Sequence, residues 1–242
     1  MKVLVATDKP FAPVAVTQIR EVTEKGGHTL ALLEKYKTPQ ELHAAAADAD
    51  AMIVRSDIVD AALIAAAPKL KIVVRAGAGY DNLDLQACTA RNIVAMNTPG
   101  QNSNAVAELA FGMMIYAARG GFDGKTGSEL LGKSLGLHAF GAVGKCMARI
   151  AAGFGMKVYA FDPFVDKKII AESGVTAVNT VEELYSSCQY VSLHIPANDK
   201  TKNSIGEKLL SLMPGGAVLV NTARKEVITE TELSALMEKR TD

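Results

Sequence analysis

Residues 133–163 carry the residue types that could hold a phosphate-containing ligand. Residues 134–139 form a short apolar run typical of a buried parallel strand, and a glycine turn, a helical apolar pattern and a second apolar run at 157–161 follow. A strand that leads through a tight turn into a helix places free backbone N–H groups and a partial positive charge beside a phosphate. This layout predicts dinucleotide binding.

The turn reads Ala139-Phe140-Gly141-Ala142-Val143-Gly144. Gly141 would let the backbone approach a pyrophosphate, and Gly144 would let the helix pack closely on the strand. Ala142 and Val143 would add N–H groups at the start of the helix. Ala139 occupies the position of the first glycine of the usual fingerprint, so an ordinary strand–helix turn remains the alternative.

Asp162 follows the second apolar run, where dinucleotide-binding proteins carry an acid. Its carboxylate would accept hydrogen bonds from the adenosine ribose hydroxyls and repel a 2′-phosphate, which favours NAD over NADP. A solvated acid without a ligand is the alternative.

Two arginines come shortly after predicted strands and could bind an anionic substrate. They are Arg55 and Arg224. A guanidinium matches a carboxylate or a phosphate with two parallel hydrogen bonds. The alternatives are a generic surface arginine at 224 and a salt bridge from Arg55 to Asp57 or Asp81. Arg75 is a similar candidate that we expect to be structural.

Composition narrows the function classes. The chain has 242 residues, and Lys+Arg and Asp+Glu both number 26, so no electrostatic footprint for nucleic acid or a membrane surface is present. The hydrophobic fraction of 49% suffices for one large core or two. Met1 leads straight into an apolar run without a signal-peptide pattern, and no apolar stretch is long enough to cross a bilayer, so we expect a cytoplasmic protein.

The three cysteines are scattered without paired spacing. Cys88, Cys146 and Cys188 therefore predict neither a metal site nor a disulfide framework, and we expect them to be small core residues in a reducing compartment.

Strand-like and helix-like segments alternate along the whole chain, which predicts parallel sheets covered by helices on both faces. The expected strands are 2–6, 29–33, 51–54, 71–74 and 93–96, followed by 134–139, 157–161, 175–178, 190–194 and 217–220. Ser/Thr-x-x-Glu capping boxes are expected at 38–41, 180–183 and 229–232. Polar and glycine-rich clusters follow the third, fourth and fifth strands, where ligands bind on such sheets.

The second half of the chain contains five expected strands, whereas dinucleotide-binding sheets usually have about six. We therefore expect that the fold has a further C-terminal part beyond this sequence.

Five stretches together resemble the D-isomer-specific 2-hydroxyacid dehydrogenases. They are RAGAGYDN (75–82), NTPGQNSNAVAEL (97–109), the 133–163 stretch, VSLHIP (191–196) and LVNTARKEVI (219–228). Within the family, RAGAGYDN, NTPGQN and NTARKEVI are most similar to the short-form branch that oxidises D-3-phosphoglycerate to 3-phosphohydroxypyruvate, at the first step towards serine.

The resemblance implies two doubly wound parallel-sheet domains. One is a flavodoxin-like substrate-binding domain (1–97, with its C-terminal return segment absent), and the other is a Rossmann NAD-binding domain (98–242, incomplete). It also implies NAD as the cofactor, a small 2-hydroxy acid as the substrate and a homodimer formed through the NAD domains.

The resemblance also assigns residues. Arg224 matches the catalytic arginine, which binds the substrate carboxylate and C2 oxygen. Arg55 matches an arginine that faces the phosphate, the backbone N–H groups of Ala76 and Gly77 match the carboxylate-binding turn, and Asn102 matches a residue that lines the same site. Further cofactor contacts are expected from His194, Ile195, Pro196, Asn221, Thr222 and Ala223, although a structural role for His194 is equally open, and His138 is expected only to pack in its strand.

Two departures from the family pattern stand out besides Ala139. Lys225 follows Arg224 where most relatives have glycine. The family's acid/base histidine lies C-terminal to Arg224, whereas His28, His43, His138 and His194 all precede it.

Two other functions stay open at this point. One is a glyoxylate/hydroxypyruvate reductase or another 2-hydroxyacid dehydrogenase. The other is an NAD-sensing binding protein that does not turn over substrate.

Overall fold

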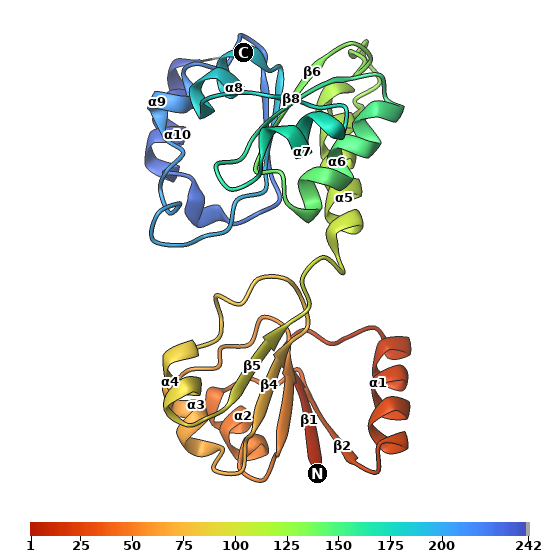
Figure 1. The fold of residues 1–242 in the computed structure, drawn as a ribbon, viewed down its shortest axis with the longest axis vertical. Helices are drawn as coiled ribbons and strands as arrows, with labels where there is room; N and C mark the ends of the chain where they lie inside the picture. The colour runs from red at the N-terminus through yellow and green to blue at the C-terminus, as the bar shows by residue number, and fades with distance from the viewer. Residues whose placement is uncertain (241–242) are drawn as a thin grey trace. The chain divides into compact units, whose positions relative to one another are not determined.

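The computed structural model describes residues 1–240, which form two compact units, one of residues 1–101 and one from Asn102 onward (Figure 1). Each unit is built on one five-stranded parallel sheet, so the predicted α/β class with two parallel sheets is confirmed. Within residues 1–240, no helix is long and apolar enough to cross a membrane.

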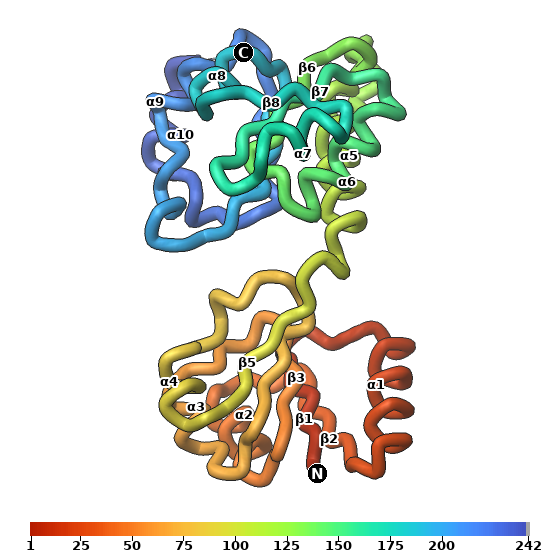
Figure 2. The backbone as a smooth tube through the Cα atoms, viewed as in Figure 1, coloured from red at the N-terminus to blue at the C-terminus, as the bar shows by residue number. Residues whose placement is uncertain are grey.

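The first unit has the strand order β2-β1-β3-β4-β5, and Figure 2 shows β1 beside β3. This is the flavodoxin-like order, in which ligands bind where the β1 and β3 carboxyl ends diverge. The elements are β1 (Lys2–Thr7), α1 (Pro13–Lys25), β2 (Thr29–Glu34), α2 (Pro39–Ala46), β3 (Ala51–Val54), α3 (Ala61–Ala66), β4 (Ile72–Arg75), α4 (Leu85–Ala90) and β5 (Val94–Asn97).

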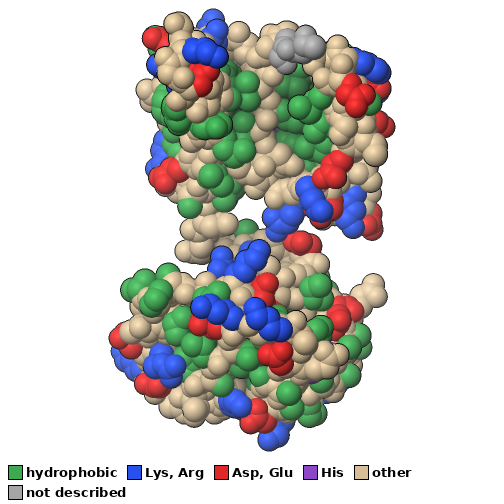
Figure 3. Space-filling view, turned by 180° about the vertical axis from the view of Figure 1, so that it is seen from behind, with side chains coloured by type: hydrophobic (Ala, Val, Ile, Leu, Met, Phe, Trp, Pro, Cys, Tyr) green, Lys and Arg blue, Asp and Glu red, His purple; other side chains and the backbone are tan. Residues whose placement is uncertain are grey.

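Alternation of side chains along β1 divides the first unit into layers. Leu4 and Ala6 face a buried cluster that includes Leu42 of α2 and Leu63 of α3, while α1 lies on the opposite side of the sheet (Figure 1). Because all five strands are parallel, their carboxyl ends meet at one edge of the sheet. Figure 3 shows Lys and Arg side chains among Asp and Glu side chains on this unit.

The second unit has the order β10-β9-β6-β7-β8, so the chain leaves β6 in one direction and later returns on its other side. The crevice between the β6 and β9 ends is the expected ligand position for such a sheet. The elements are α5 (Ser103–Ala118), a 3-10 turn (Gly120–Phe122), β6 (Ser134–His138), α6 (Ala142–Gly153), β7 (Lys157–Phe161), α7 (Lys167–Glu172), β8 (Thr176–Ala177), α8 (Val181–Ser187), β9 (Tyr190–Leu193), α9 (Glu207–Leu210), β10 (Val218–Asn221), a 3-10 turn (Lys225–Val227) and α10 (Glu230–Lys239).

Helices cover both faces of this second sheet (Figure 1). Residues of α5 and α6 pack with Leu135 and Leu137 of β6 on one face. Residues of α8, α9 and α10 pack with Val191 and Leu193 of β9 on the other. The glycine turn that precedes α6 is thereby held between two packed layers.

Thr38 and Thr180 cap α2 and α8 as predicted, because their hydroxyl groups accept hydrogen bonds from the N–H groups of Glu41 and Glu183. The predicted capping box at 229–232 is wrong. The Thr229 hydroxyl donates to the carbonyl of Asn203 instead of capping α10.

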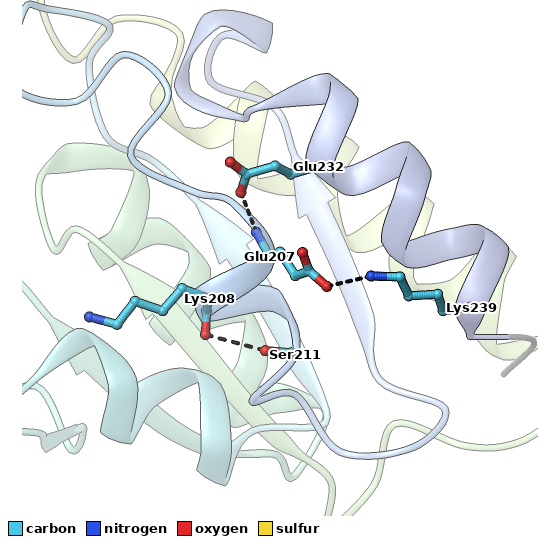
Figure 4. A network of polar contacts seen from close by, with 5 residues as sticks. All are labelled: Glu207, Lys208, Ser211, Glu232 and Lys239. Atoms are coloured by element: carbon cyan, nitrogen blue, oxygen red, sulfur yellow. Dashed lines mark hydrogen bonds and ion pairs between the residues drawn. The ribbon is translucent and has the colours of Figure 1, made fainter.

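Glu232 has a different partner from the one a capping box requires. Its carboxylate accepts the N–H of Glu207 at 2.7 Å, at the start of α9, and Lys239 of α10 pairs with the Glu207 carboxylate at 2.8 Å (Figure 4). These contacts connect α9 to α10 beside the loop that follows β10.

Candidate functional site

The turn between β6 and α6 has an uncommon backbone. Ala139 has φ +89°, in the left-handed region where glycine is favoured, and its N–H donates to the Phe161 carbonyl at 2.9 Å. This explains why the usual fingerprint has glycine at the position of Ala139. The alanine adopts the same turn at a cost in backbone strain.

The two glycines of the turn serve different purposes. A Cβ on Gly144 would lie 2.6 Å from the Ala139 carbonyl oxygen, so glycine is needed for α6 to pack on the turn. A Cβ on Gly141 would have no atom within 4 Å. Internal packing therefore does not require glycine at 141, and the open space would admit an external group.

The start of α6 offers unpaired donors. Gly141 is the N-cap residue, and no side chain caps the helix. The first N–H with an intrahelical partner is that of Lys145, which donates to the Gly141 carbonyl at 3.0 Å. The N–H groups of Ala142, Val143 and Gly144 therefore have no partner within the helix. Together with the positive end of the helix dipole, they could bind an anion.

Asp162 lies at the predicted position after β7 and is bound to the same turn. One carboxylate oxygen accepts the N–H of Phe140 and the other accepts the N–H of Phe164, both at 2.8 Å. Each oxygen keeps acceptor capacity, so this carboxylate can also accept hydrogen bonds from ribose hydroxyls.

Two polar side chains lie side by side at the ends of β9 and β10. Leu193 pairs with Asn221, and His194 and Thr222 continue the same register. Among the described residues, no group bonds to the buried His194 Nε2 or Thr222 Oγ1. Buried polar atoms normally have partners, so these two atoms are consistent with a polar ligand at this edge.

The imidazoles of His138 and His194 lie near one another below this edge. His138 Nδ1 lies 3.2 Å from the Tyr185 hydroxyl. The backbone N–H of His194 donates to the backbone carbonyl of His138. Burial lowers the pKa of His138 to about 4, and burial, with a smaller contribution from His138, lowers the pKa of His194 to about 4. Both rings are therefore neutral at pH 7.

Arg224 is half-buried at the end of the loop that follows β10. The side chain of Asn221 holds this loop, since it donates to the Arg224 carbonyl at 2.8 Å and accepts the Ala223 N–H at 2.9 Å. Arg224 donates to the carbonyl of Ala223 at 2.9 Å. Asn221 and Ala223 thus position Arg224, a role that the sequence pattern does not indicate.

Ile195 and Pro196 continue from His194 in the loop after β9. Ile195 is buried and Pro196 is exposed. The sequence places both beside the two unpaired polar atoms, and their contacts with a cofactor remain a prediction.

The residues of the second unit fit a dinucleotide. Gly141 leaves open space, the first N–H groups of α6 are available, Asp162 provides ribose acceptors, and His194 and Thr222 have unpaired polar atoms. A pyrophosphate at the turn and a ribose at the carboxylate would use these features.

In the first unit, Arg55 directly follows β3, so it lies where the carboxyl ends of β1 and β3 diverge. We call this place the β1/β3 switch point. Its Nη1 donates to the carbonyls of Lys9 and Pro10 at 3.2 Å each, and its guanidinium lies 5.4 Å from the centre of the Phe11 ring. In residues 1–240, no carboxylate pairs with this guanidinium, so the alternative of a salt bridge to Asp57 or Asp81 is wrong. The Nε–Nη2 edge retains its donors.

The structure corrects the predicted carboxylate-binding turn. The N–H of Ala76 donates to the Val54 carbonyl at 2.8 Å, and the N–H of Gly77 donates to the Arg75 carbonyl at 2.9 Å. Both N–H groups are therefore occupied and unavailable to a substrate.

The next two N–H groups are better donors. Thr98 N–H donates to the Gly77 carbonyl and Asn97 Nδ2 donates to the Ala78 carbonyl, at 2.9 and 2.7 Å. In a trans peptide the N–H points opposite to the carbonyl, so the N–H groups of Ala78 and Gly79 point away from β5. Neither donates to any residue in the described range.

Arg75 contacts the backbone of Arg55, and its structural role stays a prediction. Its Nε donates to the Arg55 carbonyl at 3.0 Å. Gly77 has φ +156°, a backbone conformation that favours glycine, and a Cβ there would also displace the end of the Arg75 side chain. Asn102 is exposed just before α5, where its side chain does not cap the helix, and it belongs to the second unit rather than to the Arg55 loop.

Comparison with known proteins identifies the family to which the chain is similar. Residues 93–241 match the family described as D-isomer specific 2-hydroxyacid dehydrogenase, NAD binding domain. A crystal structure of cofactor (NAD+)-bound 3-phosphoglycerate dehydrogenase from Entamoeba histolytica matches with a TM-score of 0.94 and 48% identity, over 100% of this chain and 78% of that chain.

Two curated relatives have different names. D-3-phosphoglycerate dehydrogenase of Methanocaldococcus jannaschii is 37% identical over 81% of this chain and 40% of its own length. Hydroxypyruvate reductase of Thermotoga maritima is 38% identical over 77% of this chain and 64% of its own length. The chain thus spans less than two thirds of either relative.

The family match covers most of the chain and includes the turn, Asp162 and Arg224, and the solved relative extends the match to the first unit. The chain belongs to the D-isomer-specific 2-hydroxyacid dehydrogenase family and carries its NAD-binding domain.

Proposed function

We propose that the protein oxidises D-3-phosphoglycerate to 3-phosphohydroxypyruvate with NAD as the hydride acceptor. The Entamoeba histolytica and Methanocaldococcus jannaschii relatives carry the corresponding names. The observation on which the choice of substrate rests is Arg55, a guanidinium at the β1/β3 switch point with no carboxylate partner in the described residues.

The second unit holds the dinucleotide. The N–H groups of Ala142, Val143 and Gly144 would bind the pyrophosphate, and the Asp162 carboxylate would accept hydrogen bonds from the ribose hydroxyls. When bound, NAD supplies the hydride acceptor for the C2 hydrogen of the substrate. His194 and Thr222 would offer polar atoms to the cofactor at the β9 and β10 ends.

The remaining groups bind the substrate. Arg55 binds the phosphate through its Nε–Nη2 edge, and the N–H groups of Ala78 and Gly79 bind the carboxylate. Arg224 binds the carboxylate and the C2 oxygen, where its charge stabilises the oxygen as the C2–H bond breaks. We assign no proton acceptor among the described residues.

The test follows NADH oxidation by the complete protein with 3-phosphohydroxypyruvate and, in parallel, with hydroxypyruvate. A higher kcat/KM for the phosphorylated acid supports the proposal. Arg224→Ala should lower kcat/KM for both acids by more than about tenfold, about 1.4 kcal/mol, since Arg224 acts on atoms that both share. NADH binding without turnover of either acid would favour the NAD sensor.

A hydroxypyruvate reductase is the second candidate, because the Thermotoga maritima relative of that name is 38% identical over 77% of this chain. Equal or reversed preference for the unphosphorylated acid would identify it. Arg55 would then have a structural role.

We also propose a homodimer formed through the second unit. Leu109, Met113 and Tyr116 of α5 are 59, 42 and 56% exposed, and they line a mainly apolar groove with residues 218–220 of β10. Exposed apolar patches of this kind mark interaction sites. Light scattering should give twice the chain mass, and a strictly monomeric protein would contradict the proposal.

A further inference from the structure

A buried carboxylate in the first unit has no role in the chemistry above. Asp57 is 4% exposed. One of its oxygens accepts the Asp8 N–H at 2.8 Å and the Tyr36 hydroxyl at 2.6 Å, and the other accepts the Arg55 N–H at 3.1 Å. A buried carboxylate is costly unless such donors satisfy it.

Hydrogen bonds, rather than an ion pair, satisfy Asp57. Throughout residues 1–240, no Lys or Arg side chain pairs with it. The titratable group that faces it is Tyr36, whose pKa is raised by burial and by the hydrogen bond to Asp57. Removal of the carboxylate would therefore leave three donors without their acceptor.

The partners of Asp57 come from the loops after four neighbouring strands. Asp8 follows β1, Tyr36 follows β2 and Asp57 itself follows β3. Asn82, from the loop after β4, donates to the carbonyls of Asp57 at 2.7 Å and Arg55 at 3.3 Å. Asp57 is thus the common anchor of the loops at the β1/β3 switch point, where ligands bind on this sheet.

Arg55 depends on this anchor in two ways. Its backbone is held directly, because its N–H donates to Asp57. Its guanidinium is held indirectly, because the Lys9 and Pro10 carbonyls and the Phe11 ring belong to the loop that Asp57 binds at Asp8. A shift of either loop would move the Nε–Nη2 edge.

We propose that Asp57 is a positioning residue that sets the preference for a phosphorylated acid by holding Arg55 and the 8–11 loop in place. The inference rests on the proposed function, because it needs the substrate phosphate to bind Arg55. It assigns Asp57 no contact with the substrate.

Asp57→Asn in the complete protein tests the proposal. The amide replaces one acceptor oxygen with a donor, so at least one of the three hydrogen bonds is lost. The KM for 3-phosphohydroxypyruvate should rise about tenfold with little change in kcat, since the lost alignment affects binding of a remote group. The kcat/KM for hydroxypyruvate and the Kd for NADH should stay unchanged.

Two matched variants extend the test. Tyr36→Phe removes one donor and keeps the carboxylate, so it should raise the same KM by a smaller factor. It also serves if Asp57→Asn does not fold. Asp48→Asn removes an exposed carboxylate of the same unit, which pairs with Lys2, and should leave both substrates unaffected.

A double-mutant cycle with Arg55→Ala separates positioning from general stability. If Asp57 acts through Arg55, Asp57→Asn should add little to the KM effect of Arg55→Ala. Additive effects, or equal losses with both acids and with NADH, would overturn the proposal. A wild-type protein with no preference for the phosphorylated acid would instead contradict the proposed function, and with it the role of the Arg55 edge.

Discussion

Ala139 has φ +89°, which alanine adopts only at a cost of about 1–2 kcal/mol. Ala139→Gly should relieve this strain. Because glycine also raises the entropy of the unfolded chain, we expect a net gain of about 0.5–1 kcal/mol in the free energy of unfolding. Urea unfolding of the two proteins measures it.

The same substitution at a helical position is the control for Ala139. Ala152 is exposed in α6, and Ala152→Gly should destabilise by up to about 1 kcal/mol. If Ala139→Gly were as destabilising as Ala152→Gly, the turn would carry no strain.

The Asp162 carboxylate should set the choice of cofactor. Asp162→Asn removes the charge that repels a 2′-phosphate, so the ratio of NADPH to NADH dissociation constants should fall by about tenfold or more. Titration of NADH and NADPH fluorescence measures both constants, and the absence of tryptophan removes one source of background. Asp166→Asn, four positions further on and exposed, should leave the ratio unchanged. Equal binding of the two nucleotides by the wild type would refute this role.

At the scale of an element, α6 and its turn separate ligand contact from packing. Gly141→Ala introduces a Cβ with no atom within 4 Å, so stability should change by less than about 1 kcal/mol while the Kd for NADH rises about tenfold or more. Gly144→Ala places a Cβ 2.6 Å from the Ala139 carbonyl oxygen and should lower stability and affinity together, by roughly 1–3 kcal/mol in stability.

Gly153 provides the control on the same helix. It lies in α6, and a Cβ at this position would have no atom within 4 Å, so Gly153→Ala should keep NADH affinity and not reduce stability. If Gly141→Ala bound NADH as well as Gly153→Ala does, the pyrophosphate would not lie at this turn.

Elements were predictable where local and tertiary signals agree. The strand–turn–helix around Gly141 and the caps at Thr38 and Thr180 depend on short-range spacing, and the structure has all three. The predicted cap at Thr229 is absent because residues distant in sequence bind its two side chains. The Thr229 hydroxyl donates to the Asn203 carbonyl, and the Glu232 carboxylate accepts the Glu207 N–H.

The carboxylate-binding loop shows a second limit of sequence reasoning. The RAGAGYDN stretch indicates a glycine-rich loop, but which N–H groups are free depends on partners elsewhere. Val54 engages Ala76, and Asn97 and Thr98 orient the peptides that expose Ala78 and Gly79. The Asp57 anchor was missed for the same reason, since its partners lie in separate loops.

At the scale of the whole molecule, the histidine pair predicts acid sensitivity. Burial lowers the pKa of His138 and His194 to about 4, below the unfolded value of 6.5. Between these values the unfolded state binds more protons, so stability should be lost as pH falls from 6.5 towards 4. We expect a loss of about 1–2 kcal/mol per histidine between pH 7 and pH 5.

Urea unfolding at a series of pH values checks this slope. His194→Gln should make it shallower, because one of the two groups no longer titrates. A free energy of unfolding that is constant between pH 7 and pH 5 would show that the two rings are not shielded in solution.

The proposed function requires that the second unit binds NAD and that Arg55 of the first unit binds the phosphate of the substrate. The most direct measurement is the ratio of kcat/KM for 3-phosphohydroxypyruvate to that for hydroxypyruvate, in the complete wild-type protein and in Arg55→Ala. We predict a wild-type ratio of about ten or more that falls towards one in the variant, because the variant lacks the guanidinium that binds phosphate. A wild-type ratio near one, or a ratio that Arg55→Ala leaves unchanged, would contradict the account.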